Sequence, residues 1–183
     1  MSLFCLFLFQ CWGIKGSILS IDGKNLINQI PTFSAYYFIN LAPKLSICGE
    51  VEYWQKGYRE AEGTRSKECT FSSLSLQETI FFALPWRKIE FKLGPGIGIY
   101  LLKNYVEERS EEGYWIITEY YNLNSNPVGF HIASLIEFSF SKFSLSGGVK
   151  FGILFLEPEK ENLFYTRGDL KEIAYSIGIS LAM

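Results

Sequence analysis

The residues of this chain best suited to acid–base chemistry are its single histidine and the carboxylates near it. His131 and Glu137 lie in one alternating segment, and a histidine beside a carboxylate suits general-base catalysis. A hydrolase of this kind also needs a nucleophilic serine on the same face. Ser134 has the opposite parity, and Ser139 lies about 26 Å along an extended segment. A serine from a neighbouring segment could still supply the nucleophile, so a lipid-modifying hydrolase remains an alternative. We nevertheless expect that the chain is not an enzyme.

A larger set of ionisable side chains lies on the same face of the alternating segments as the small residues. Glycine, alanine and serine fill the rest of that face, which is typical of the crowded interior of a narrow barrel. Charges enclosed there must pair, so we expect a structural ion-pair network that plugs the interior. A gated polar path or a proton-linked site is the alternative, and an open porin channel is not expected. The set comprises Lys15, Glu50, Glu52, Glu90, Lys92, His131, Glu137 and Lys150.

Two further patterns carry no chemistry. The segment Gly94-Pro-Gly-Ile-Gly98 resembles a phosphate-binding loop in composition, but it lies inside an alternating strand and does not open a helix. The four cysteines show no metal-ligand or redox spacing. The sequence therefore predicts no cofactor, no metal site and no nucleotide site.

The elements that position these residues are strands. Residues 173–183 alternate large apolar side chains with alanine, serine and glycine, as a strand does between lipid and a crowded interior. The same period recurs along the chain and predicts an all-β, eight-stranded antiparallel up-and-down transmembrane β-barrel. We expect its strands at about residues 12–21, 33–39, 44–55, 71–84, 87–101, 128–138, 143–155 and 173–183.

The connections between these strands alternate in length. Short turns are expected near Asn40, Pro85 and Ser141, and long polar loops at residues 22–32, 56–70, 103–127 and 156–170. Short periplasmic turns and long extracellular loops are typical of outer-membrane barrels. Part of the longest loop, residues 114–121, either extends a barrel hairpin or forms a recognition surface for a partner or a glycan. Its aromatic residues are Tyr105, Tyr114, Trp115, Tyr120 and Tyr121.

Composition supports this interpretation. Aromatic residues make up 17% of the 183 residues, which suits the aromatic girdles of a barrel. A net charge of −2 gives no electrostatic reason to expect nucleic-acid binding. Residues 1–11 form a short apolar stretch, which we interpret as a truncated secretory signal peptide, with the barrel domain at residues 12–183. We expect a monomer in the cell outer membrane.

Three segments resemble PorT-like outer-membrane β-barrel proteins, a family of OmpX/OmpA-type barrels. Residues 12–17 resemble the first strand of that family, residues 50–57 its third and residues 93–102 its glycine-rich fifth. Two positions depart from the family pattern. The chain ends in Met183 where an aromatic residue is usual, and Glu78 falls on an apolar face. Either a bulge shifts the register at Glu78, or this carboxyl lies near the headgroups.

The resemblance implies an outer-membrane barrel with a structural or surface-contact role. Its partners would be membrane lipid and an extracellular or envelope protein. A soluble or periplasmic lipocalin-like barrel that binds an apolar ligand is the alternative, and the lipid-modifying outer-membrane hydrolase is the second. The lipocalin-like barrel would need apolar residues inside and polar residues outside.

Overall fold

The computed structural model describes residues 10–22, 27–62, 65–112, 115–156 and 168–182, all of which belong to strands or short connections. Most of the expected signal segment, residues 1–11, lies outside this range. No helix in the described part of the chain is long and apolar enough to cross a membrane. The strands are β1 Gln10–Asp22, β2 Ile27–Ala42, β3 Leu45–Glu62, β4 Arg65–Trp86, β5 Ile89–Glu112, β6 Trp115–Ser125, β7 Val128–Ser139, β8 Phe143–Leu156 and β9 Gly168–Ala182.

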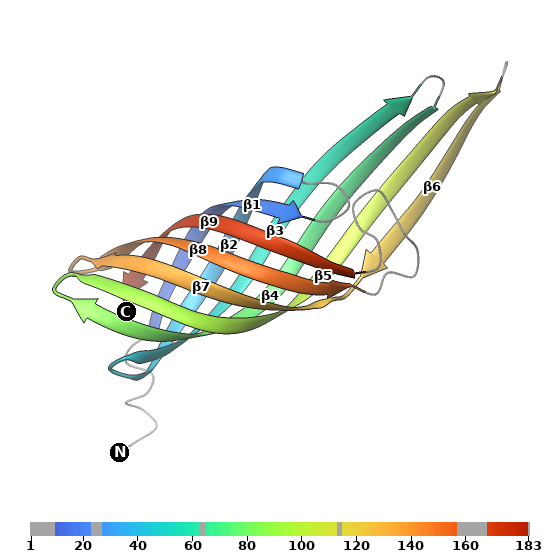
Figure 1. Ribbon diagram of the computed structural model, residues 1–183. Coiled ribbons are helices and arrows are strands. Elements are labelled where there is room, and N and C mark those ends of the chain that lie inside the picture. The colour runs from blue at the N-terminus through green and yellow to red at the C-terminus, as the bar shows by residue number, and fades with distance from the viewer. Residues whose placement is uncertain (1–9, 23–26, 63–64, 113–114, 157–167, 183) are drawn as a thin grey trace.

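These strands form one closed antiparallel barrel (Figure 1). The order β4-β3-β2-β1-β9-β8-β7-β5-β6 is closed by the pairing of β4 with β5. β7 pairs with β5 over residues 89–99, and β6 pairs with β5 over residues 102–112. β6 and β7 are thus two parts of one barrel strand, interrupted at Asn126 and Pro127. Eight strands surround the interior, and the predicted fold class is confirmed.

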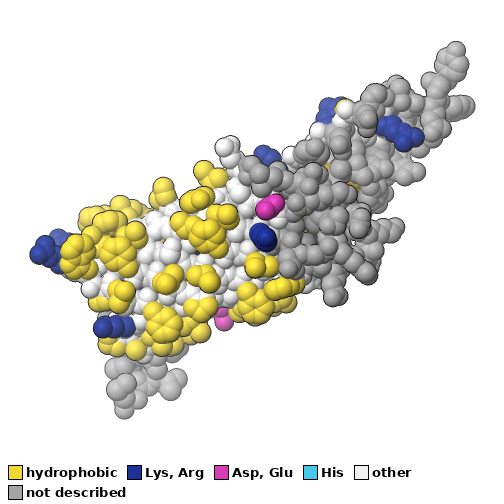
Figure 2. Space-filling view, viewed as in Figure 1, with side chains coloured by type: hydrophobic (Ala, Val, Ile, Leu, Met, Phe, Trp, Pro, Cys, Tyr) yellow, Lys and Arg dark blue, Asp and Glu magenta, His cyan; other side chains and the backbone are white. Residues whose placement is uncertain are grey.

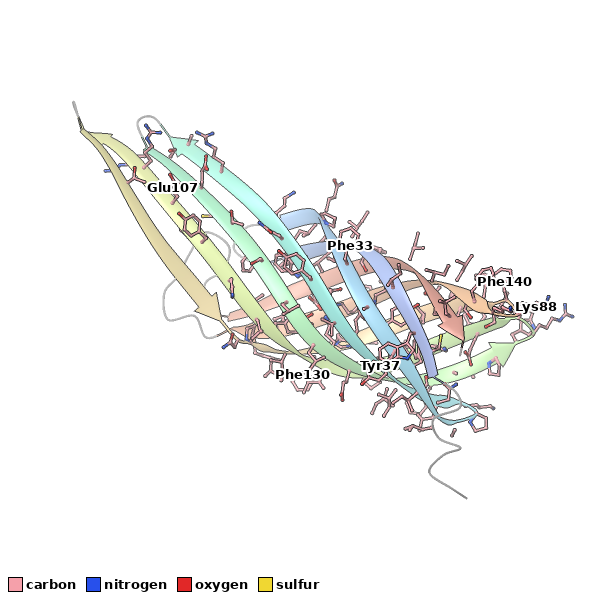
Figure 3. All side chains as sticks on the ribbon, turned by 180° about the vertical axis from the view of Figure 1, so that it is seen from behind. Phe33, Tyr37, Lys88, Glu107, Phe130 and Phe140 are labelled. Carbon is pink, nitrogen blue, oxygen red and sulfur yellow. The ribbon has the colours of Figure 1, made fainter. Side chains whose placement is uncertain are left out.

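The predicted alternation separates the two faces of the wall. On β9, Ile177 is 77% exposed, whereas Ala174 and Ser180 are each 2% exposed. Apolar side chains cover the barrel wall in Figure 2, and Phe33 and Phe130 lie on the outside of the barrel in Figure 3. Since an apolar outer face is the surface that a barrel presents to lipid, the wall has the character of a transmembrane barrel.

The connections at one end of the barrel are short, as predicted. Residues 43–44, 87–88 and 140–142 join successive strands there, and we call this the turn end. Arg87 adopts a positive φ of 59°, a conformation that tight turns use. The opposite end carries the extended strands, and we call it the hairpin end.

The prediction of long loops at residues 56–70 and 103–127 is wrong, because these segments form β-hairpins that continue barrel strands. β3 and β4 stay paired up to Glu62 and Arg65, and β5 and β6 up to Glu112 and Trp115. β4 and β5 also pair along this stretch, up to Arg65 and Ser110. The result is a four-stranded sheet projecting beyond the barrel, which we call the extension (Figure 1). The outward positions of this stretch carry polar residues such as Gln55, Lys103 and Arg109, which suit water rather than lipid, so the apolar outer face that marks a wall strand is absent.

The first long connection is also shorter than predicted. β2 begins at Ile27, not Phe33, and pairs with β1 through a register shift between Leu19 and Ile21. Gln29, with φ 57°, interrupts the regular pattern. The polar residues near this irregularity have the composition of a loop, so the sequence predicted a loop where the backbone is paired as a strand. The last predicted loop, 156–170, lies largely outside the described residues.

Candidate functional site

Lys150 on β8 is the centre of the largest polar cluster of the barrel interior. Its Nζ atom donates to Glu52 Oε1 at 3.2 Å and to Gln77 Oε1 at 3.0 Å. The same atom lies 3.5 Å from Glu172 Oε1, which also accepts a hydrogen bond of 3.0 Å from the Tyr100 hydroxyl. All five side chains are buried. One lysine therefore holds two buried carboxylates that come from β3 and β9.

A second polar group lies next to this cluster. Lys15 Nζ donates to Glu50 Oε2 at 2.6 Å, and Thr79 Oγ1 lies 2.8 Å from His131 Nε2. These residues line a partly open cavity of about 40 Å³, which has room for a water molecule. Glu50 Oε1 and His131 Nδ1 have no hydrogen-bond partner within the part of the chain that the structure describes. Both polar and apolar side chains line the cavity, and it is too small for an organic ligand.

A third polar group lies at the turn end. Lys92 Nζ donates to Glu137 Oε2 at 2.7 Å and lies 3.1 Å from Glu90 Oε2. The same ammonium lies 4.3 Å from the centre of the Phe38 ring, a cation–π contact. These groups line an opening of about 530 Å³ at this end. Phe38 lines both this opening and the inner cavity.

Apolar layers lie on either side of the first two polar groups. Along β3 the inward residues run Ser46, Cys48, Glu50, Glu52 and Trp54 from the turn end upward. Cys48 belongs to a lower apolar cluster and Trp54 to an upper one, so the two glutamates lie between them. The lower cluster consists of Tyr36, Phe38, Cys48 and Phe81. The upper cluster consists of Leu19, Ile21, Ile30, Trp54, Cys69, Phe71, Tyr100, Leu102, Val106, Leu154 and Ala174.

All eight charged residues singled out from the sequence lie on the inner side of the wall. Lys15 and Glu90 are half-buried, and the other six are buried. The partners Gln77, Tyr100 and Glu172 were missed. Gln77 and Tyr100 have inward parity within predicted strands, but the predicted set contained charged side chains and the histidine only. Glu172 lies one position before the predicted start of the last strand.

The geometry gives no support to the hydrolase alternative. The partner of His131 is Thr79, whereas Glu137, which the sequence placed beside the histidine, pairs with Lys92. Ser134 lies on the outer face, as its parity predicted. No serine hydroxyl in the described part of the chain is hydrogen-bonded to His131, and its Nδ1 atom lacks the carboxylate that orients the base of a triad.

Four of the five aromatic residues of the predicted contact surface belong to the extension. Tyr105 on β5 is 42% exposed and pairs with Thr70 on β4 and Asn122 on β6. The backbones of Trp115, Tyr120 and Tyr121 lie on β6, in agreement with the predicted hairpin extension. Tyr114 lies outside the described residues.

Comparisons with known proteins establish the fold. No family model matches the chain, and no curated protein matches its sequence. Among solved structures, a major outer membrane protein from Thermus thermophilus is similar with 12% identity and a TM-score of 0.62, over 95% of this chain and 99% of that one. Neisserial surface protein A is similar with 10% identity and a TM-score of 0.58, over 95% and 97%. Ail, the attachment invasion locus protein of Yersinia pestis, is similar with 12% identity and a TM-score of 0.53, over 96% and 97%.

The chain therefore has the fold of small outer-membrane β-barrels, and its apolar wall is the surface that such a barrel presents to lipid. The expected location in the outer membrane is confirmed by this combination. The lipocalin-like alternative needs the reverse distribution, with apolar residues inside and polar residues outside. Apart from Glu78, the described wall carries its charges inward, and its large apolar side chains point outward.

Proposed function

We propose that this chain is a surface-contact protein of the outer membrane, in which the barrel is an anchor and the extension is the contact element. The observation that carries the proposal is the long pairing of β4 with β5, which keeps one register from Trp86 opposite Ile89 to Arg65 opposite Ser110 and is broken only at residues 80–81 and 94–95. Because the strands are continuous from wall to tip, the barrel holds the extension rigidly. Glu107, on the extension in Figure 3, lies beyond the apolar wall.

The edges of the extension suit contact with another protein. Within the described residues, β3 has no partner on its β2 side beyond Trp54, and β6 pairs only with β5. A strand edge without a partner presents backbone N–H and C=O groups that an extended segment of another chain can bind. We infer a protein partner that adds a strand to one of these edges.

The charge of the extension argues against a sulfated glycan as the partner. A second structure of Ail contains the heparin analogue sucrose octasulfate. In this chain, segments 55–72 and 103–125 carry six basic and eight acidic residues, a net charge of −2. The basic residues are Lys56, Arg59, Arg65, Lys67, Lys103 and Arg109, and the acidic ones are Glu60, Glu62, Glu68, Glu107, Glu108, Glu111, Glu112 and Glu119. A net negative surface repels a polyanion, whereas a protein partner needs no such charge.

The filled interior supports an anchor role over transport. Buried ion pairs and two apolar clusters occupy the inside of the barrel, and an eight-stranded barrel has little more space than its own side chains need. Membership of the PorT-like family remains a prediction that rests on the three sequence segments.

The proposal is tested by shortening both hairpins, which leaves the outer wall intact and removes only Cys69 and Val106 from the upper apolar cluster. Gly57 pairs with Thr70, and Asn104 with Leu123, so Asn-Gly turns replace residues 58–69 and 105–122. The shortened and full-length proteins are displayed on a host bacterium, and adhesion to immobilised extracellular-matrix proteins is measured. A band shift between unboiled and boiled gel samples shows that each barrel is folded.

Adhesion by the full-length protein and its loss in the shortened, folded protein are the expected results. Equal adhesion by both proteins, or none by either, contradicts a contact role of the extension toward this class of partner.

A further inference from the structure

The three turns at the turn end carry basic residues and no acidic ones. Their basic residues are Lys44 between β2 and β3, Arg87 and Lys88 between β4 and β5, and Lys142 between β7 and β8. All four side chains are exposed, and none forms an ion pair with a residue in the part of the chain that the structure describes. The segments that precede β1 and follow β9, residues 1–9 and 183, contain no aspartate or glutamate. We call these four residues the basic rim.

The barrel holds the three basic turns side by side. β4 lies between the turn that carries Lys44 and the turn that carries Lys88, and the backbone N–H of Ala83 donates to the Lys44 carbonyl oxygen at 2.9 Å. On the other side, the N–H of Ser139 donates to the Lys88 carbonyl oxygen at 3.0 Å, and β7 then leads into the turn that carries Lys142. Figure 2 shows Lys and Arg side chains at this end of the molecule, and Lys88 is labelled there in Figure 3. The basic rim therefore follows adjacent strands from β2 round to β8.

The basic rim lies directly beyond the apolar wall. Trp86, which precedes Arg87, is 63% exposed, and Phe140 stacks on Phe143 with ring centres 4.6 Å apart. Aromatic rings at the edge of an apolar wall are typical of the boundary between hydrocarbon and lipid headgroups. The described outward positions nearer the middle of the wall are uncharged except for Glu78, past which β3 and β4 pair without a bulge. The basic side chains are thus at the level of the headgroups.

The carboxylates of the turn end do not pair with the basic rim. Glu90 and Glu137 have inward positions on β5 and β7, where each contacts the ammonium of Lys92. The four positive charges of the rim are therefore directed to the outside of the barrel, whereas the extension at the opposite end has a net charge of −2. A partner that complements the rim must supply negative charge at the edge of the apolar wall.

We propose that the basic rim binds the headgroups of anionic phospholipids. The short turns of outer-membrane barrels face the periplasm, so the lipids belong to the periplasmic leaflet. Lys and Arg side chains next to a membrane surface attract anionic headgroups, and the acyl chains of the same lipid lie against the apolar wall beside Trp86. One molecule thus complements both the charge of the rim and the apolar surface next to it. This site does not depend on the extension or its partner.

The test measures lipid binding to the full chain refolded in micelles of an uncharged detergent. Dioleoyl phosphatidylglycerol, which is anionic, is compared with dioleoyl phosphatidylcholine, which has the same acyl chains and no net charge. Native mass spectrometry over a series of lipid concentrations gives a dissociation constant for each lipid. The rim variant combines Lys44→Gln, Arg87→Gln, Lys88→Gln and Lys142→Gln. The matched control makes the same change of charge in the extension, with Arg59→Gln, Arg65→Gln, Lys67→Gln and Arg109→Gln. The gel shift on boiling shows that each barrel is folded.

Wild type and the extension variant are expected to bind phosphatidylglycerol about tenfold more tightly than phosphatidylcholine, the effect of one or two basic side chains on each anionic headgroup. The rim variant is expected to bind the two lipids equally. Salt at about 1 M is expected to remove the preference of the wild type, because it screens exposed charges. A wild type without the preference, a rim variant that keeps it, or an extension variant that loses it would each overturn the proposal.

Discussion

At the scale of single residues, Lys150 is the group on which the interior depends most. It is the ammonium that both Glu52 and Glu172 contact, and all three side chains are buried. Lys150→Met keeps most of the volume but leaves two carboxylates without their cation. We expect the free energy of unfolding to fall by about 3–5 kcal/mol, the cost of removing one partner of a buried pair. Urea unfolding in lipid vesicles measures this loss.

Arg59→Met is the matched control for Lys150→Met. Arg59 Nε lies 3.1 Å from Glu68 Oε1, but both side chains are more than half exposed. Water screens such a pair, so its loss is expected to change stability by less than about 1 kcal/mol. Similar effects of the two substitutions would show that the interior is hydrated and that Lys150 is not a buried pairing residue.

Parity in the sequence placed the charged residues on the inner side, but it did not identify their partners. Lys150 and Glu52 come from β8 and β3, which are not neighbours in the sheet. Which inward residues meet across the interior depends on the stagger of the strands when the barrel closes. Alternation along one strand contains no information on that stagger, so the pairing of His131 with Thr79 was not predictable.

At the scale of the strands, Gly94 of β5 lies where the backbone of β4 comes close to that of β5. The sequence predicted small residues on this face because the barrel interior is crowded. A Cβ atom at Gly94 would overlap the Ile80 carbonyl oxygen of β4, which is backbone and cannot rotate away. Gly94→Ala is therefore expected to destabilise the barrel by about 1–3 kcal/mol through forced backbone shifts. The measurement is the urea midpoint of unfolding in vesicles.

Gly16→Ala on β1 is the comparison for Gly94→Ala. A Cβ atom at Gly16 meets nothing within 4 Å, so alanine fits without displacement. A small gain in stability is expected, because alanine restricts the unfolded chain more than glycine does. If both alanine variants unfold at the wild-type midpoint, the contact between β4 and β5 is looser than the structure shows.

The extension shows where strand prediction fails. In the wall, lipid on one side and crowding on the other force large apolar and small residues to alternate, so each wall strand was found. Beyond the wall the outward positions are polar, as at Arg59 and Arg109, so the apolar period ends although Val106 on the inner side stays buried. Backbone pairing continues without that signal, because the barrel below fixes the register of the strands.

At the scale of the whole molecule, the arrangement of layers predicts a barrel that does not conduct ions. The upper cluster, with Trp54 and Phe71, and the lower cluster, with Phe38 and Phe81, close the interior on either side of the ion pairs. In planar lipid bilayers we expect no stepwise currents from the wild type, because each apolar layer alone excludes hydrated ions.

Because the two layers are independent, removing one should leave the barrel closed. Trp54→Ala with Phe71→Ala opens the upper cluster only, and no current is expected. Adding Phe38→Ala and Phe81→Ala opens the lower cluster as well, and currents are then expected through the polar region between Glu50 and Lys150. Each variant must first show the heat-dependent gel shift of a folded barrel. Currents from the wild type, or equal currents from the double and quadruple variants, would contradict closure by two separate layers.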